Sequence, residues 1–564
     1  MTTMREHASG GTAGTAPGRS KTPAVIRLLV LATFVVILNE TIMINAIPRL
    51  MADMDVTEQA AQWLSTAFML TMAAVIPVTG WFLQRVTTRR AYATAMGVFL
   101  AGTALASVAP VFEVLLLARI VQATGTAVMM PLLMTTLMTV VPEEDRGRVM
   151  GNVTMAISVA PALGPAVSGL ILQLGSWRLL FAAVLPVAAL VAWRGLGRLE
   201  NVGEPQAGTI DWFSVAAAAL GFGSLVYGLS RFGQGSAVVP TVIVAVGAVT
   251  IAVFAVRQLR LQRRDVPLLD LRVLRHPVYA LSLLLMALGF MAMMGSMILL
   301  PIYLQNLRGL TPLETGLLMM PGGLAMGLLG PVVGRLFDRF GGRMLIIPGA
   351  AGIVLALAGF TQISATMPYW QVLGLHSLLM VSLAAAFTPV FTLGLGALPA
   401  PLYSHGSSML GTLQQVSAAF GTALVVTVMT GRAEGRIADG VAAAAAQLDG
   451  MRLAFVISAA LSLVMVGVAF LLPGRAKAAA APEAPPRPRR RPPTGLWSPP
   501  PSERTGAHRT GGGETRSHRR PVRFCLTGSG GGPGRRGTGP GRSAASGSRG
   551  PRPWRGGAEA RWGR

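Results

Sequence analysis

Cysteine is nearly absent from this sequence of 564 residues, which contains one, Cys525, close to its C-terminal end. A single cysteine cannot form a disulfide framework or a thiolate metal site within one chain. The sequence also lacks the HExxH pattern of zinc hydrolases and the GxxxxGK[ST] loop that binds nucleoside triphosphates. We therefore expect no metal, no cofactor and no ATP hydrolysis in this chain. Any energy-requiring process that this protein carries out must then be driven by a gradient or by a partner.

Charged residues are also scarce, at 13% of the chain, whereas 52% of the residues are hydrophobic and the mean hydropathy is +0.56. Average soluble domains carry about twice that share of charge. Apolar stretches of about twenty residues, the length that crosses a bilayer, recur from the mid-twenties to Leu472. The segment Met1 to Lys21 is polar, so we expect no secretory signal peptide. The composition therefore predicts an all-α, polytopic membrane protein.

Fourteen transmembrane helices are predicted when spans are placed by apolar length and loops by charge. The predicted spans are residues 25–47, 62–82, 91–109, 112–140, 150–172, 177–195, 211–230, 237–256, 278–302, 315–333, 344–362, 369–395, 407–430 and 452–472. We divide the chain into a disordered cytoplasmic N-terminus (1–24), a six-helix bundle (25–195), a linker with two inserted helices (196–277), a second six-helix bundle (278–472) and a tail (473–564).

Basic residues fall in alternate loops, as the positive-inside rule requires of cytoplasmic loops. The basic loops contain Arg85, Arg89 and Arg90, then Arg146 and Arg148, Arg194 and Arg198, the arginines of 257–275, and Arg335, Arg339 and Arg343. An even number of spans returns the chain to the side on which it started. Both termini are therefore predicted to be cytoplasmic.

The tail carries much of the net charge of +25, because residues 475–564 hold 20 Lys and Arg against 4 Asp and Glu. The segment is dominated by Arg, Gly, Pro and Ser, a composition that cannot bury enough apolar surface to fold. Binding of nucleic acid or anionic lipid is the alternative to an incidental disordered tail. Because aromatic residues are sparse and no recognition motif occurs, we expect no nucleic-acid partner.

A short internal repeat links the two predicted bundles. GWFLQRVTTRR from Gly80 and GRLFDRFGGRM from Gly334 share an initial glycine and arginines five and nine residues later. Each segment follows the second helix of its bundle. This spacing predicts two bundles related by a parallel repeat, with the helix pair inserted between them; the alternative is two coincidental basic loops.

Motifs in a fixed order resemble a known family, the fourteen-helix drug:proton antiporters of the major facilitator superfamily, and especially their lincomycin-resistance-like branch. The motifs are LNETIMINAIP, QWLSTAFMLT, GWFLQRVTTRR, RIVQATGTAVMMPLLMT and PALGPAVSG in the first half, and LLPIYLQNLRGLTPLETGLLMMPGG, GRLFDRFGGR and SSMLGTLQQVSAAFGTAL in the second. The resemblance covers residues 25–472 and implies the major facilitator fold. It further implies a multi-pass protein of the bacterial inner (plasma) membrane.

Two positions depart from the family pattern. The usual acid of the first helix is replaced by Asn39, and the carboxylate lies one residue later at Glu40, which turns it by about 100° on a helix. The first bundle's loop has Gln84 where many relatives place Asp, whereas the second keeps Asp338. A charge relay is therefore expected only in the second loop.

Two charged residues, Glu40 and Arg119, lie within predicted apolar spans, where an ionisable side chain is costly and commonly functional. Glu40 is the candidate proton carrier, with a structural cap or ion pair as the alternative. The resemblance implies that Arg119 influences the acid; the alternative is a structural arginine bonded to backbone carbonyls. His376 is the next candidate carrier, although a lone intramembrane histidine is more often a packing residue.

The substrate cavity is expected between the two bundles, near the bilayer midplane. Gln122 and Thr126 follow Arg119 by three and seven residues, which places the three side chains on one helix face. Flexible methionines suit a pocket that accepts varied shapes, although ordinary packing explains most of them. The predicted cavity residues are Asn39, Gln122, Thr126, Met130 and Gln414.

Two further sets complete the predicted site. The resemblance implies an antiporter motif in the fifth helix, where small residues and prolines bend and pack the helix; simple packing is the alternative. The cytoplasmic loops of the repeat are expected to act as gates, although the positive-inside rule explains part of their charge. The antiporter set is Pro161, Gly164, Pro165 and Gly169; the gating set is Gly80, Arg85, Arg89, Gly334, Asp338, Arg339 and Arg343.

Together these features predict a secondary active exporter of amphipathic small molecules that exchanges them for protons. An uptake carrier of the same superfamily is the main rival, and a non-transporting receptor or scaffold is the second. Clustered catalytic side chains are absent from the sequence, so we do not expect an enzyme. The expected partners are a small-molecule substrate, protons and the lipid bilayer, and the expected functional unit is a monomer.

Overall fold

The computed structural model describes residues 23–43, 46–202, 205–206, 208–232, 237–264 and 266–473. The segment before residue 23, the tail from residue 474 and Cys525 lie outside these residues, as does the side chain of Pro165. The predictions made for those parts of the chain therefore stay predictions.

Fourteen long helices run through the described residues. In chain order they are α1 (Ala24–Ile42), α3 (Glu58–Arg85), α4 (Thr88–Ser107), α5 (Phe112–Val140), α6 (Arg146–Gln173), α7 (Arg178–Arg198), α8 (Trp212–Ser230), α9 (Val238–Gln262), α10 (Pro277–Ile302), α11 (Pro312–Phe340), α12 (Arg343–Phe360), α13 (Tyr369–Gly396), α14 (Tyr403–Ala438) and α15 (Ala443–Leu471). A short helix, α2 (Ile47–Met54), follows α1.

Thirteen of these helices are long and apolar enough to cross a bilayer within the described part of the chain. The fourteenth, α4, is 20 residues long and packs against α5 and α7. Helices suit this environment because they pair their own backbone N–H and C=O groups where water is absent. The predicted number and order of spans are confirmed.

Several predicted boundaries were wrong. The first predicted span, 25–47, ends at Ile42, and α2 is a separate helix that ends where Asp55 adopts a left-handed conformation with φ of 50°. Helix α14 starts at Tyr403 and ends at Ala438, beyond the predicted 407–430. Hydropathy detects only the part of a helix that lies in hydrocarbon, so polar turns that continue the helix are missed.

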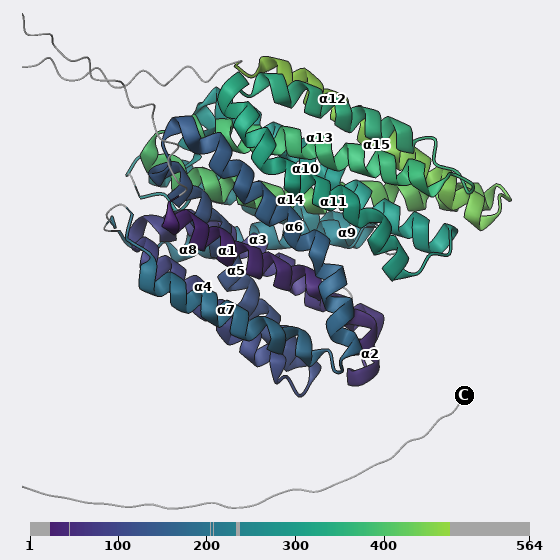
Figure 1. Cartoon of the computed structure of the whole chain (residues 1–564), viewed down its shortest axis with the longest axis horizontal. Helices are drawn as coiled ribbons and strands as arrows, with labels where there is room; N and C mark the ends of the chain where they lie inside the picture. Colours follow the sequence, from purple (N-terminus) through teal and green to yellow (C-terminus); the bar gives the residue numbers. More distant parts are fainter. Residues whose placement is uncertain are drawn as a thin grey trace, which may run out of the picture. The chain divides into compact units, whose positions relative to one another are not determined.

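The two bundles share one packing pattern, and Figure 1 shows α1, α4, α5 and α7 grouped on one side of the view and α10, α12, α13 and α15 on the other. In the first, α5 packs against α1, α3 and α4, and α1 packs against α6 and α7. In the second, α13 packs against α10, α11 and α12, and α10 packs against α14 and α15. Helices that hold the same position in the order of the two bundles therefore make equivalent contacts, as a parallel repeat requires.

The bundles meet mainly along two helix pairs, α6 with α11 and α3 with α14. Glycines make the first contact close: a Cβ atom on Gly151 would collide with the carbonyl oxygen of Gly330, and one on Gly334 with that of Gly147. Small residues allow such backbone-to-backbone approach in membrane helices. Both pairs join helices that are second and fifth in their bundles.

The inserted helices α8 and α9 pack on each other, and α8 also packs on α3 and α14. The buried Gln258 of α9 joins this pair to the following segment. Its Nε2 donates to Ser214 Oγ at 2.8 Å, and its Oε1 accepts from the backbone N–H groups of Leu268 and Leu269 at 2.8 and 3.2 Å. The inserted pair therefore lies against one helix of each bundle.

Candidate functional site

Glu40 and Arg119 lie close together inside the first bundle. Glu40 is in the last turn of α1 and is partly buried, whereas Arg119 on α5 is 1% exposed. The two side chains interact electrostatically, although no direct ion pair between them is among the described contacts. The structure thus brings together the two residues that the sequence singled out.

Arg119, on α5, also connects this helix with α3 and α4 of the same bundle. Its Nη1 donates to Gln122 Oε1 at 2.9 Å, and Gln122 Nε2 donates to Thr103 Oγ1 of α4 at 3.0 Å. The guanidinium lies 4.2 Å from the centre of the Phe68 ring on α3. Its Nε is buried and has no described hydrogen-bond partner. Arginine keeps its charge at any physiological pH, so its action on Glu40 is electrostatic.

The predicted cavity residues occupy different surroundings. Gln122 and Thr126 are buried on one face of α5, where Thr126 Oγ1 donates to the backbone oxygen of Gln122 at 2.9 Å. Asn39 is fully buried, and neither polar atom of its amide has a described hydrogen-bond partner. Met130 on α5 and Gln414 on α14 are half-buried. Contact of these five residues with a substrate stays a prediction.

Asp338, near the end of α11, closes the cytoplasmic side of the bundle interface. Its two carboxylate oxygens accept from the backbone N–H groups of Gly147 and Arg148 at 2.9 and 2.8 Å. These are N–H groups of the first turn of α6, which begins at Arg146 and has no intrahelical acceptors for them. Asp338 therefore caps a helix of the opposite bundle, where a negative charge is favoured.

The equivalent position of the repeat, Gln84, makes a different contact. Its Nε2 donates to the backbone oxygen of Pro401, which precedes α14, at 3.0 Å. One turn earlier Gly80 lies against His405, and a Cβ atom there would be 3.0 Å from His405 Nδ1. Gln84 and Asp338 thus both bond to the chain near the start of the fifth helix of the opposite bundle. Of these two residues, Asp338 makes the contact with a carboxylate and Gln84 with a neutral amide.

Hydroxyl groups join the bundles between these two points. Thr79 Oγ1 lies 2.6 Å from Ser408 Oγ, and Thr135 Oγ1 lies 2.7 Å from Ser407 Oγ. Deeper in the interface, Thr388 Oγ1 on α13 donates to Thr154 Oγ1 on α6 at 3.0 Å. We use the name cytoplasmic seam for the contacts between the bundles on this side. The seam consists of these three hydroxyl pairs together with the contacts that Gly80, Gln84 and Asp338 make across the interface.

The arginines of the predicted gating set make most of their described contacts with their own bundle or with the linker. Arg89 uses its backbone N–H to donate to Asn201. Arg339 lies over the Phe340 ring and Arg343 over the Phe470 ring. Arg85 lies over Trp81, one turn earlier on the same helix. Gly80, Gly334 and Asp338 pack or hydrogen-bond across the interface, and Arg85 interacts electrostatically with His405 of α14. A gating role for all seven predicted residues stays a prediction.

The predicted antiporter motif lies in α6, which continues through Pro161 to Gln173. A Cβ atom on Gly164 would collide with the side chain of Thr41 on α1, so this glycine allows α6 to approach the turn that carries Glu40. A Cβ atom on Gly169 would meet nothing within 4 Å. Close packing therefore accounts for Gly164 but not for Gly169.

The predicted spans 369–395 and 407–430 left His405 in the loop between two helices, and this was wrong. The residue lies in the first turn of α14 and is 3% exposed. The helix start was missed because the residues around His405 are polar, although the helix continues through them. His376, the other buried histidine of the described chain, packs against Gly322, and its Nδ1 has no described hydrogen-bond partner. That arrangement fits a packing role.

Every hydrogen bond described between the bundles lies toward the ends of the helices that carry the basic loops. By the positive-inside rule this end is cytoplasmic. The structure is therefore closed on its cytoplasmic side, with Glu40 near the opposite end of the first bundle.

Comparison with known proteins agrees with this geometry. The family model of the Major Facilitator Superfamily matches residues 29–422. The uncharacterized transporter YcnB of Bacillus subtilis is 39% identical over 450 residues, which cover 79% of this chain and 94% of the relative. The lincomycin resistance protein LmrB of Listeria innocua is 36% identical over 430 residues, 76% of this chain and 89% of the relative.

Among solved structures, the human organic anion transporter MFSD10 superposes with a TM-score of 0.59 at 15% identity, covering 79% of this chain and all of that chain. At this identity the likeness concerns the fold. The bacterial relatives and the apolar helices identify a multi-pass protein of the bacterial plasma membrane. The chain therefore belongs to the major facilitator superfamily.

Proposed function

We propose that this protein is a secondary active exporter that moves amphipathic small molecules, including antibiotics, out of the cell in exchange for protons. Relatives named for lincomycin resistance and multidrug resistance support export of such compounds. The observation that carries the proton-coupling part is the electrostatic interaction between Glu40 and the buried Arg119.

The ionised and the protonated forms of Glu40 interact differently with the buried guanidinium of Arg119. When Glu40 is ionised, Arg119 attracts it; when Glu40 is protonated, that attraction disappears and the acid becomes neutral. Because Gly164 places α6 against Thr41, a change at the Glu40 turn reaches a helix that also forms the bundle interface. Protonation would thereby bias the arrangement of the two bundles.

The cytoplasmic seam supplies the second part of the cycle. Its contacts exist when the cytoplasmic side is closed and must break when the substrate site opens to the cytoplasm. Alternation between these two arrangements, driven by protons that enter from outside, would carry the substrate outward. The residue ranges 25–195 and 278–472 are our proposed moving units.

An uptake carrier of the same superfamily would use the same fold, so the direction of coupling must be measured. A non-transporting receptor or scaffold would not need a charged pair at this position. We further propose that the chain is not an enzyme, acts as a monomer and binds no nucleic acid.

The test uses inverted membrane vesicles that contain the full chain and have an acidified lumen. Lincomycin, other antibiotics and cationic dyes are added in turn while the lumenal pH is followed with a fluorescent amine. An exporter coupled to protons accumulates the added compound and releases protons from the lumen, and Glu40→Gln abolishes the release. Uptake in the opposite direction across the panel, or transport that ignores the proton gradient, contradicts the proposal.

A further inference from the structure

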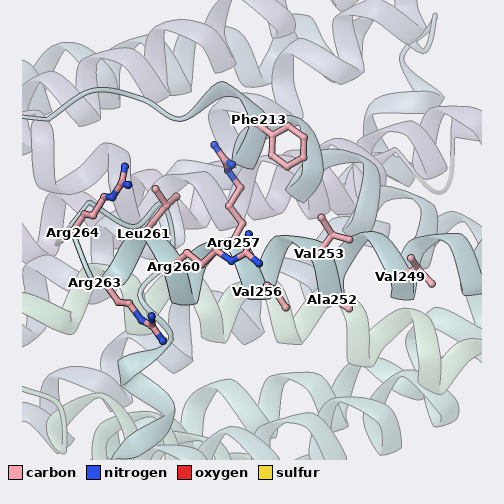
Figure 2. A pocket seen from close by; sticks show the side chains of 10 residues that line it. All are labelled: Phe213, Val249, Ala252, Val253, Val256, Arg257, Arg260, Leu261, Arg263 and Arg264. Carbon is pink, nitrogen blue, oxygen red and sulfur yellow. The ribbon is translucent and has the colours of Figure 1, made fainter.

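The inserted helices carry a groove of about 920 Å³ that is lined mostly by exposed residues of α8 and α9 (Figure 2). Its apolar wall is formed by Phe213 of α8 and by Val249, Ala252, Val253 and Val256 of α9. Val249 is 64% exposed and Val253 47%. No described part of the chain covers this wall, so in a bilayer it contacts lipid.

The groove changes character along α9, as Figure 2 shows: the valines lie at one end and arginines at the other. Arg260 is followed by Arg263 and Arg264, just beyond the helix end at Gln262. From Val249 to Arg260 the helix rises by about 16 Å. That length is close to the hydrocarbon thickness of one leaflet, about 15 Å.

The basic end has a surplus of positive charge. Arg257 is neutralised by Asp211, with Nε and Nη2 donating to the carboxylate at 2.7 and 2.8 Å, and this pair is held at the start of α8. Arg260, Arg263 and Arg264 form no ion pair with any residue that the structure describes. No carboxylate among the described residues neutralises these three cations, which an occupant of the groove would meet.

We propose that this groove binds an anionic glycerophospholipid of the cytoplasmic leaflet. The phosphate lies among Arg260, Arg263 and Arg264, and an acyl chain lies along the valine wall. Basic pockets on the cytoplasmic side of membrane proteins bind such head groups. Arginine suits phosphate because its planar fork donates two parallel hydrogen bonds.

The positive-inside rule accounts for arginines at this end but not for the rest of the site. Topology needs charge in the loop, whereas Arg260 lies within α9 and the groove continues from it into the hydrocarbon region. Topology would also survive without these three arginines, because Arg272 and Arg275 remain in the same loop. The two explanations can therefore be separated by substitution.

The test measures retention of phosphatidylglycerol by the purified full chain in detergent, counted by native mass spectrometry during a lipid titration. Replacing Arg260, Arg263 and Arg264 with Gln should raise the apparent Kd for phosphatidylglycerol by roughly tenfold or more. Retention of zwitterionic phosphatidylcholine should stay unchanged, which also reports that the variant is folded.

The matched control replaces Arg90, Arg194 and Arg198, which are exposed at the cytoplasmic ends of α4 and α7 and do not line the groove. This variant should shift the Kd by less than about threefold. Equal weakening by both triple variants would mean that general surface charge attracts the lipid, and the site would be refuted.

A second variant tests the acyl part without changing charge. Ala252→Trp fills the apolar wall from an exposed position, so it should weaken phosphatidylglycerol binding and leave binding of soluble glycerol phosphate as it was. If glycerol phosphate displaces the lipid at equal concentration, or if Ala252→Trp has no effect, the groove is not a lipid site. These measurements do not depend on transport, so they stand apart from the proposed export function.

Discussion

Asp338 offers the sharpest test of the cytoplasmic seam, because one carboxylate in α11 caps the first turn of α6 across the interface between the bundles. The Asp338→Asn variant keeps the size of the side chain but removes its charge. An amide has one acceptor oxygen in place of two, so one of the N–H groups of Gly147 and Arg148 loses its partner.

The magnitude follows from two contributions. Loss of one of the two capping hydrogen bonds costs about 0.5–1.5 kcal/mol, and loss of a negative charge at a helix N-terminus costs about 0.3–1 kcal/mol. Together they weaken the closed state by about 1–2.5 kcal/mol, which shifts the equilibrium toward a cytoplasm-open state by a factor of about 5–70. Asp338→Lys should shift it further, because a cation would face the positive end of α6.

The assay measures a distance across the seam. Spin labels at Thr139 on α5 and Ala400 before α14 occupy exposed positions on the cytoplasmic side of different bundles. Replacement of Cys525, the single native cysteine, gives the labelling background. The distance distribution from electron–electron double resonance should gain a longer component in Asp338→Asn, and transport should fall.

Gln84→Ala is the matched control, since Gln84 holds the equivalent position of the repeat with a neutral, exposed hydrogen bond to Pro401. A neutral hydrogen bond contributes about 0.5–1.5 kcal/mol, so the long-distance component should grow less than in Asp338→Asn. Equal shifts in both variants, or none in either, would refute the argument that the charged cap holds the seam.

Two further predictions concern packing around the same parts. Arg119→Lys should reduce proton-coupled transport, because one ammonium group cannot both reach Gln122 and lie over Phe68 as the planar guanidinium does; the vesicle assay checks this, and full activity would show that charge alone matters. Gly334→Ala should favour the cytoplasm-open state, because its Cβ atom would collide with the Gly147 oxygen in the closed seam; unchanged spin-label distances would contradict this.

Much of the fold was predictable because a helix that crosses a bilayer needs an apolar stretch of about twenty residues. Apolar stretches of the right length predicted all fourteen spans in order, and the Gly80 and Gly334 segments predicted the repeat. Helix ends were less predictable, because α14 continues through the polar residues around His405. Hydropathy carries no information about polar turns that lie at the membrane surface.

The candidate site was predicted in its residue types more than in its contacts. Embedded charges indicated Glu40 and Arg119 because few reasons exist to keep such groups in an apolar span. The cap that Asp338 provides for α6 joins residues 190 positions apart, and no local pattern indicates such a partner. The groove on α9 was missed for a related reason, since its arginines were assigned to topology.

The role of Glu40 is tested by separating binding and exchange from uphill transport. Glu40→Gln keeps the shape of the side chain but fixes it in a neutral state next to Arg119. The variant should lose proton-driven accumulation against a gradient, because its neutral side chain no longer alternates between two charge states. Substrate exchange across the membrane without a gradient should remain, since exchange needs the site and the movement of the bundles alone.

Glu40→Asp supplies the matched control because it retains a carboxylate. Its shorter side chain changes the distance to Arg119, so the variant should keep part of the uphill transport with a shifted pH profile. Accumulation and exchange are measured in the same vesicle preparation, which removes differences in expression. If Glu40→Gln drives full uphill export with normal proton release, the carboxylate is structural, and the coupled proton must move through another group. His376 is then the first residue to substitute, because it is a buried titratable side chain in a transmembrane helix of the second bundle.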